Sequence, residues 1–435
     1  MPVNSSRGAI AVKALGFTNG SASDYYYIAK VTNIAGSLYN GIIALGYQNG
    51  TFLVNYGVVS ATDQRSIANQ FDRTMNVITA SRTYYDVPNV PSFFGLERPA
   101  VASDTSGNMY FYSAGFLNKQ SAAGAGWAYT FDVSGSPSSS SWRSGVGVSS
   151  AGDVYVSSRI NISSYARHVI QKINSSGTVQ YAKRVDVASQ PIVYSTGIKL
   201  AGNYISFAGG YINKLFVALT DLDVTVSFCK EVSTSLQIPE AVDGSDTVCD
   251  SAGNTYFVYA VSSGGSSTSS VLRAVKFNSS GTVQWNKEYD VPAGVRYTSA
   301  ALTGGYLWIA TTVYSTGTTY LLKVLGDDGS VTLSRSISHP TDTDGSSNAI
   351  NVTNTSVQVS LEPIFLTLRL PVTGVGTGSY TVGGTSVTYS TASIAASTVS
   401  DSFSTAATTV TSETTSNSSV TTRSATSLTV AVTQV

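Results

Sequence analysis

Two histidines are the residues of this chain best suited to proton transfer or metal binding. They are His168 and His339, and the cysteines are Cys229 and Cys249. Neither histidine has a second His or Cys close by in the sequence, whereas zinc sites and catalytic triads need several such groups to converge. No nucleophile elbow, phosphate-binding loop or His-Glu-x-x-His motif stands out. We therefore assign no catalytic, cofactor-binding or metal-binding residue, and we expect a protein that is not an enzyme.

Paired carboxylates are the other candidate chemistry, because glycosidases use two acids that flank the bond they cleave. The candidates are Glu97, Asp104, Asp153, Glu240, Asp243, Asp246 and Asp250. Asp104, Asp153 and Asp250 lie in or beside turns, where an Asp side chain accepts backbone hydrogen bonds, and we expect that role for them. The segments Asp327-Asp328-Gly329 and Asp342-Thr343-Asp344-Gly345 offer too few oxygens for a calcium loop, so we expect turns there too.

Adjacent aromatic residues are the candidate anchors for a carbohydrate or protein ligand. The groups that stand out are Tyr25-Tyr26-Tyr27, Tyr84-Tyr85 and Phe93-Phe94. Successive side chains on a strand point to opposite faces, so one member of each group would be exposed unless both faces are covered. We favour burial between stacked sheets, and the binding residues stay unassigned.

The composition indicates a β-rich protein with an uncharged polar surface. Charged residues make up 11% of the 435 residues, and 25 basic side chains balance 25 acidic ones. A neutral chain lacks the positive field that drives nucleic acid binding. No apolar run is long enough for a membrane-spanning helix, and residues 1–7 do not resemble a secretion signal. We expect no nucleic acid partner and no membrane insertion, and the apolar surroundings of both cysteines favour free, buried thiols.

One eight-residue segment occurs twice with a single aromatic exchange. Residues 174–181 read NSSGTVQY and residues 278–285 read NSSGTVQW. Asn can bond its own backbone and Gly accepts a positive φ, so each copy predicts a tight turn between two strands. Weaker copies at 29–38, 218–230, 322–331 and 368–374, and around Phe71 and Phe131, bring the candidate hairpins to eight. The first of them is incomplete.

A second signature precedes the hairpins: a turn containing Gly, then an alternating aromatic or β-branched strand. It occurs at 106–112, 151–156, 201–205, 252–258 and 304–309. With one more short apolar segment before it, each unit holds four strands, and valines 179, 226, 283 and 331 repeat at intervals of 47, 57 and 48 residues. This period indicates propeller blades, which must stack to bury both faces. The sequence predicts an all-β, seven- or eight-bladed β-propeller of four-stranded antiparallel blades over 1–390, closed by strands from both ends.

The segment GNTYFVYAV, followed by VLRAVKFNSSGTVQWNKEYD, within 253–290 resembles a bacterial β-propeller repeat family. In that family a Gly-Asn-x-Tyr strand precedes a Lys-x-Asn-x-x-Gly-x-x-x-Trp hairpin. The match covers roughly 100–370 and is strongest in three units. The resemblance implies the fold and is weak for function. Such propellers, followed by Ser/Thr-rich sheet, also look similar to structural proteins of tailed-phage particles.

Residues 391–435 change in composition to Ser, Thr, Ala and Val with few charges. A disordered linker is one interpretation of this segment. The sequence SLTVAVTQV at 427–435 alternates β-branched and polar residues, which favours a strand. We expect an extended Ser/Thr-rich β appendage whose edges are covered by the propeller or by a neighbouring subunit.

These observations favour a non-enzymatic structural or attachment protein of a virus particle, of the tailed-phage type, in its tail, fibre or adaptor. Its partners would be other virion proteins, further copies of itself and a host-surface glycan or protein. We expect it in the virion, assembled in the host cytoplasm. One alternative is a bacterial surface or secreted propeller that binds glycans or proteins, with an extracellular location. A propeller glycosidase is the third hypothesis.

Overall fold

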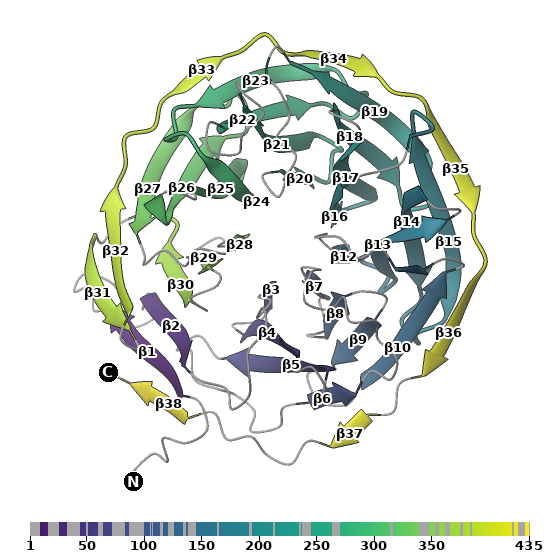
Figure 1. Cartoon of the computed structure of the whole chain (residues 1–435), viewed down its shortest axis with the longest axis horizontal. Coiled ribbons are helices and arrows are strands. Elements are labelled where there is room, and N and C mark those ends of the chain that lie inside the picture. The colour runs from purple at the N-terminus through teal and green to yellow at the C-terminus, as the bar shows by residue number, and fades with distance from the viewer. Residues whose placement is uncertain are drawn as a thin grey trace.

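Seven sheets stand side by side around a central axis and form a β-propeller (Figure 1). The computed structural model describes the backbone of residues 9–15, 26–32, 44–48, 51–59, 64–71 and 83–86, and most of the chain from 100 to 434. Between 100 and 434 it leaves out 121–125, 134–135, 138–144, 163–164, 191–193, 212–213, 237–244, 263–269, 339–347, 353–355, 362–365, 420–421, 425–430 and a few shorter stretches. Within the described part, no helix is long and apolar enough to cross a membrane.

The blades are numbered here in the order of their innermost strands along the chain. Blade 1 comprises β3 (Ala44–Gln48), β4 (Thr51–Val59), β5 (Gln64–Phe71) and β6 (Thr83–Asp86). Blade 2 comprises β7 (Ala100–Ser103), β8 (Met109–Ser113), β9 (Phe116–Gln120) and β10 (Gly126–Val133). Blade 3 comprises β12 (Gly145–Val148), β13 (Val154–Ile162), β14 (Tyr165–Ile173) and β15 (Val179–Val187), with β11 (Ser136–Pro137) also on β13. Blade 4 comprises β16 (Tyr194–Ala201), β17 (Tyr204–Tyr211), β18 (Lys214–Asp221) and β19 (Val226–Ser233).

Blade 5 comprises β20 (Asp246–Cys249), β21 (Thr255–Ser262), β22 (Ser270–Phe277) and β23 (Val283–Tyr289). Blade 6 comprises β24 (Val295–Thr303), β25 (Tyr306–Val313), β26 (Thr318–Leu325) and β27 (Val331–Ser338). Blade 7 combines β28 (Asn348–Val352), β29 (Ser356–Leu361) and β30 (Leu366–Pro371) with β2 (Tyr26–Thr32) and β1 (Ala9–Leu15). The predicted all-β propeller is therefore confirmed, and its blade number is seven.

Blade 7 closes the ring with strands from both ends of the chain. β2 pairs with β30 in antiparallel register, with Tyr27 opposite Arg369 and Lys30 opposite Leu366. Residues 29–32 of the first weak copy and residues 368–371 of the last therefore belong to one blade, and the described strands form seven blades. The innermost strands follow one another around the axis, with β28 lying beside both β24 and β3.

The C-terminal segment runs back around the outside of the ring, against the order of the blades (Figure 1). After β31 (Gly378–Val382), strand β32 (Thr385–Thr391) pairs with β27. Then β33 (Ala396–Thr398), β34 (Ser402–Thr405), β35 (Thr408–Ser412), β36 (Thr415–Ser419) and β37 (Thr422–Ser424) pair with the outer strands of blades 5, 4, 3, 2 and 1. We call residues 396–424 the belt. Finally β38 (Ala431–Gln434) pairs in parallel with β1.

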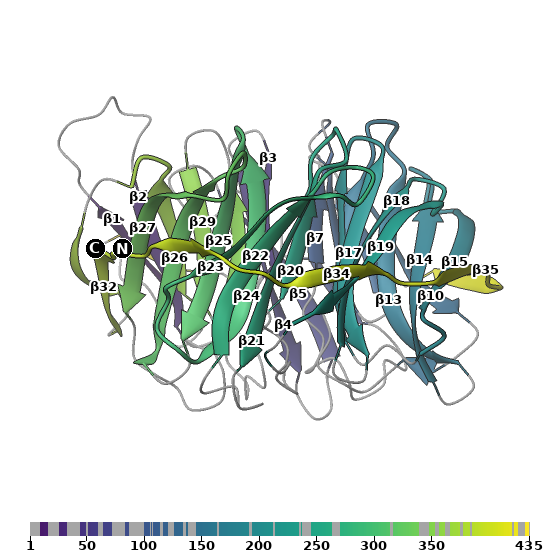
Figure 2. The ribbon, with the colours of Figure 1, turned by 90° about the horizontal axis from the view of Figure 1, so that it is seen from above.

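The belt lies midway between the two faces of the ring (Figure 2). It adds a fifth strand to each blade that it crosses, so it lies on the propeller as the outermost layer. The Ser/Thr-rich segment that the sequence analysis expected as a β appendage is thus paired, strand by strand, with the outer edges of the blades.

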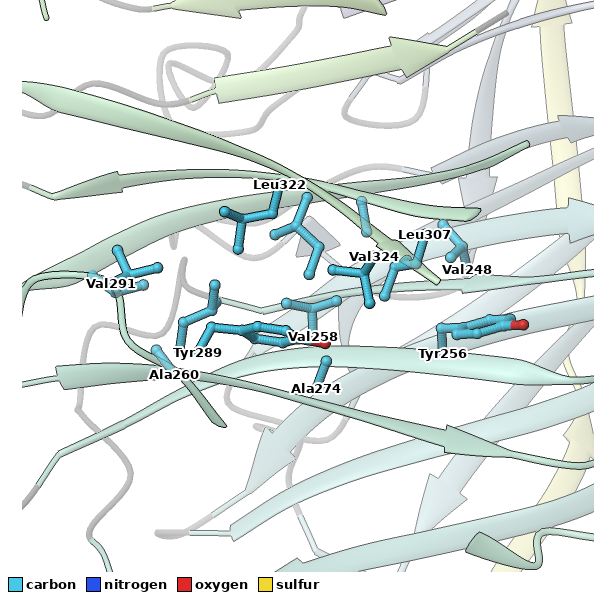
Figure 3. Packing of buried hydrophobic residues seen from close by; sticks show 14 of the residues in the cluster. Val248, Tyr256, Val258, Ala260, Ala274, Tyr289, Val291, Leu307, Leu322 and Val324 are labelled. Atoms are coloured by element: carbon cyan, nitrogen blue, oxygen red, sulfur yellow. The ribbon is translucent and has the colours of Figure 1, made fainter. Parts of the chain in front are cut away.

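Apolar side chains fill the spaces between neighbouring blades. Figure 3 shows the cluster between blades 5 and 6, where Tyr256, Val258 and Tyr289 pack with Leu307 and Leu322. Both faces of the middle strands are covered; every residue of β21 is buried. This two-sided burial explains why β21 and β25 are nearly continuous apolar and aromatic runs rather than alternating ones.

The repeated eight-residue segment forms the hairpin between the third and fourth strands of blades 3 and 5. Asn278 Oδ1 accepts hydrogen bonds from the backbone N–H groups of Ser280 and Thr282, and Gly281 has φ +78°. The register shifts by one residue beside the turn, as expected for a turn followed by a left-handed residue. Asn174 and Gly177 repeat this arrangement in blade 3. In blade 4, Val224 occupies the glycine position at φ +60°, where a β-branched residue is strained.

The aromatic residue that ends the repeated segment joins its blade to the next one. Trp285 Nε1 donates a hydrogen bond to the carbonyl of Gly326, in the hairpin turn of blade 6, at 3.0 Å. Tyr181 donates in the same way to Leu222 of blade 4, and Trp127 of blade 2 donates to Ser175 of blade 3. The segment is thus repeated because it combines a turn with a blade-to-blade contact.

Trp285→Ala is expected to lower the free energy of unfolding by about 3–5 kcal/mol, because it removes a buried indole and its hydrogen bond. Trp285→Tyr should cost less than half as much, since tyrosine occupies the equivalent position 181. Gln284→Ala, at the exposed neighbour, is the control and should change stability by less than about 0.5 kcal/mol. Chemical denaturation measures all three. A loss below about 1 kcal/mol for Trp285→Ala would contradict this role of the indole.

Candidate functional site

Two of the candidate carboxylates are turn residues, as predicted. Asp104 accepts hydrogen bonds from the backbone of Ser106 and from the backbone and side chain of Asn108. Asp250 accepts the same set from Ala252 and Asn254. Partial burial acts to raise the pKa of Asp104, but these hydrogen bonds outweigh it and hold the pKa below its usual value. Both carboxylates therefore stabilise the turn between the first two strands of a blade.

Asp153 and Asp246 have other structural roles. The expected turn role is wrong for Asp153, because Ser149 Oγ accepts the backbone hydrogen bond in that turn while the carboxylate of Asp153 forms an ion pair with Lys172 at 3.0 Å. Asp246 lies on the innermost strand β20 with 1% of its surface exposed. Its Oδ2 accepts the backbone N–H of Ala300 in blade 6 at 2.8 Å. Asp246 thus joins two blades through its contact with the backbone of Ala300.

Several of the candidate residues considered above lie outside the described residues, namely Glu97, Glu240, Asp243, His339, Asp342, Asp344, Tyr25 and Phe93-Phe94. Tyr26 and Tyr27 lie on β2 and Tyr84 and Tyr85 on β6, where only the backbone is described. Asp328 is described, and it accepts the backbone N–H of Ser330 as a turn residue does. Among the side chains that the structure describes, no group of three or more His, Cys, Asp or Glu is arranged as metal ligands would be.

His168 lies in the middle of β14 and is enclosed between blades 3 and 4. Its Nδ1 lies 2.9 Å from Ser195 Oγ, and its ring stacks on Phe207 with centroids 4.6 Å apart. Burial lowers the pKa of His168 to about 3, so the ring is uncharged at neutral pH. Its described hydrogen-bond partner is a serine and no described carboxylate orients it, so the pair lacks the third member of a triad.

The two cysteines are free and buried, as predicted. Burial raises the pKa of the Cys229 thiol to about 12 and that of Cys249 to about 11. A nucleophilic cysteine needs a lowered pKa and access to solvent, so these thiols act as small apolar residues of the core.

A group of charged side chains that was not predicted from the sequence fixes the belt. Arg273 of β22 forms an ion pair with Asp401, which lies between β33 and β34, at 2.7 Å. The side chains are only 8% and 4% exposed. Arg273 also pairs with Glu288 at 2.8 Å, and Tyr259 donates a hydrogen bond to Asp401 Oδ2. We call Arg273, Asp401, Glu288 and Tyr259 the belt anchor.

Arg273 keeps its charge in the belt anchor because two acids lie beside it. Burial acts to lower the pKa of Arg273, but Glu288 and Asp401 outweigh it and raise the pKa above its usual value. Burial, together with the charge and hydrogen bond of Asp401, raises the pKa of Tyr259 well above its usual value, so Tyr259 remains a hydrogen-bond donor. The anchor is therefore a joint between belt and ring.

A second acid fixes the belt between blades 3 and 2. Glu413 lies between β35 and β36 and forms an ion pair with Arg184 of β15 at 2.7 Å. Arg184 also contacts Asp186, which in turn pairs with Arg167. Asp401 and Glu413 are the only acidic residues from 391 to 435, and both are directed into the ring. The sequence shows that this segment has few charges, but it does not show which residues those charges pair with.

Apolar belt residues fill the remaining gaps between blades. Phe403 packs edge-on against Phe277 with ring centroids 5.2 Å apart, and Ala406 is 8% exposed between blades 4 and 3. Ile394, just before the belt, packs against the cluster between blades 5 and 6. The belt is thus held by backbone pairing, two buried acids and a few apolar contacts.

No protein-family model matches the chain, and no curated protein matches its sequence. Solved structures are similar at the level of the backbone. The polysaccharide lyase Uly1 is 9% identical, with a TM-score of 0.46 over 88% of this chain and 98% of the lyase. The hydrazine synthase of Kuenenia stuttgartiensis is 10% identical, with a TM-score of 0.46 over 78% of this chain and 97% of that one. The Dos1 propeller is 8% identical, with a TM-score of 0.40 over 82% and 93% of the two chains.

Asp401→Ala is expected to lower the free energy of unfolding by about 2–3 kcal/mol, because it leaves Arg273 buried with one acid partner fewer. Hydrogen exchange should rise in residues 396–405 more than in β21 or β22. Ser404→Ala, at an exposed belt position, is the control and should change stability by less than about 0.5 kcal/mol. In the background of Arg273→Met the loss caused by Asp401→Ala should shrink; an unchanged loss would show that the two residues are not coupled.

The stability of the protein is expected to depend on the neutral form of His168. The pKa of His168 is about 3 in the folded protein and 6.5 in the unfolded chain. The contribution of the neutral ring to stability is therefore complete above the unfolded-chain pKa and is lost as the pH falls toward the folded-state pKa. Between about pH 6 and pH 4, stability should fall more steeply in the wild type than in His168→Phe, by about 1.4 kcal/mol per pH unit. Parallel pH profiles of the two proteins from chemical denaturation would contradict this.

Proposed function

We propose that this protein is a non-enzymatic structural or attachment component of a virus particle of the tailed-phage type. The observation that carries the proposal is the belt, a segment that pairs with the outer strands of blades 5 to 1 and whose two acids form ion pairs with arginines of the ring. It would act through contacts with other particle proteins, with copies of itself and with a glycan or protein of the host surface. It would assemble in the host cytoplasm and work outside the cell.

The belt suits a protein that must keep its shape outside the cell. Without it, the outer strands of the blades would present unpaired backbone groups, and the ring would be closed only at blade 7. With the belt in place, a blade can loosen only if the belt strand paired with it is released, and that strand is covalently joined to the belt strands on the neighbouring blades. This reinforcement needs no disulfide, which agrees with assembly in a reducing cytoplasm before release.

The polar chemistry of the described blades supports a non-enzymatic role. Asp104, Asp250 and Asp246 have their carboxylates directed at backbone N–H groups, and His168 is enclosed in a blade interface. A propeller glycosidase would instead present two acids to the substrate. This is why we rank a non-enzymatic role above a glycosidase.

Electron microscopy of native particles, labelled with antibody against this protein, tests the proposal. We expect labelling at a fixed position and copy number on the particle, and no release of sugars from host polysaccharides by the purified protein. A protein found only free in solution, or at the surface of cells that carry no virus, would contradict the virion role. Release of reducing sugar would contradict the non-enzymatic role.

A further inference from the structure

The outer edge of the belt carries backbone groups that no described strand covers. β33, β34, β35 and β36 each pair inward with one blade strand and end their sheets. At blade 6 the chain itself shows that such an edge can accept another strand, because β31 pairs with the outer edge of β32 in antiparallel register. Blade 7 likewise has β38 outside β1.

The belt lacks the features that protect exposed edges. Natural edge strands are blunted by Lys, Pro, bulges or inward charges. From 396 to 419 the sequence contains no Lys, Arg, Pro or Gly. Its only acids, Asp401 and Glu413, lie between the belt strands and are directed into the ring, so they leave the strand edges themselves uncharged. The described edge is therefore neutral and open to pairing.

Strand β35 has the most favourable edge for pairing. At its centre is Val410, which is 38% exposed. Among the described residues, Val410 and Val283 are the two large apolar residues that are exposed. The N–H of Glu413 bonds to Ala182 of β15, and the carbonyl of Ala407 accepts the N–H of Ala188, which directly follows β15. Backbone groups alternate along an antiparallel strand, so those of Thr408, Val410 and Ser412 point outward. In β34, by comparison, the apolar residue Phe403 is turned onto Phe277.

We propose that β35 pairs with β35 of a second copy of this chain, antiparallel and about a twofold axis that passes between the two Val410 residues. Val410 then lies opposite its counterpart, and Thr408 lies opposite Ser412. Each outward N–H finds an outward carbonyl, so the pairing is self-complementary. The two blade 3 sheets become one continuous sheet across the dimer. A chain with zero net charge brings no general repulsion to this contact.

The inference deepens the proposed function by naming the surface for self-association, and it rests on that proposal only for the expectation that copies associate. The two can fail separately. A monomer with fixed positions in a virion would overturn the β35 contact and leave the virion role standing. A dimer joined through β35 but found in no particle would overturn the virion role and leave the β35 contact standing.

Analytical ultracentrifugation of the full-length protein tests the contact. The wild type should be a dimer at micromolar concentration. Val410→Lys places two like charges opposite each other, and Val410→Pro removes an outward N–H while leaving the bonds to β15, so both should shift the protein to monomer with at least a tenfold weaker association. Ser404→Lys, which adds the same charge at an exposed position of β34, should remain a dimer. Thermal unfolding of each variant verifies that the ring and belt are intact.

Crosslinking locates the axis. Val410→Cys should form a disulfide-linked dimer under mild oxidation, because the two side chains face each other, whereas Ser404→Cys should not. Cys229 and Cys249 are buried and should not contribute. A monomeric wild type, or a dimer that persists in both Val410→Lys and Val410→Pro, would overturn the proposal. So would equal crosslinking of the 404 and 410 variants.

Discussion

The backbone hydrogen bonds between β2 and β30 are the interaction on which the rest of the structure depends. They join a strand from the beginning of the chain to one that follows six other blades, and so convert a row of sheets into a closed ring. Only in a closed ring does every blade have a neighbour on both faces. The apolar strands such as β21, buried along their whole length, are stable only under that condition. Because this contact joins distant parts of the sequence, it has a high entropic cost of closure that the stacked cores must offset.

The belt adds a second closure of a different kind. It lies on the rim instead of in the core and runs against the order of the blades, so it connects neighbours through an independent covalent path. Its strands are three to five residues long, and their pairing alone would hold them weakly. Asp401 and Glu413 supply what the short strands lack, because a buried acid with an arginine partner tolerates no shift in register.

Polar groups in the described blades are used mainly as joints. The Asp or Asn side chains at 104, 174, 250 and 278 accept hydrogen bonds from the backbone of their turns. Trp127, Tyr181 and Trp285 each donate a hydrogen bond to a hairpin turn of the following blade. With most surface polarity supplied by uncharged Ser and Thr, the molecule presents a neutral exterior. Such a surface favours contacts made by shape and backbone pairing over electrostatic steering, which agrees with a part in an assembly.

The sequence by itself determined the blades, because their signals are local. Turn chemistry at Asn174 and Asn278, the period of the repeats and the apolar second strands need only neighbouring residues, and they predicted the all-β propeller and the turn roles of Asp104 and Asp250. The tertiary structure decided what depends on distant partners. Pairing of β2 with β30 set the blade number at seven, and the registers of residues 396–424 showed a Ser/Thr-rich tail to be a belt. Asp401 and Arg273 are 128 positions apart, and the sequence around either residue does not identify the other as its partner.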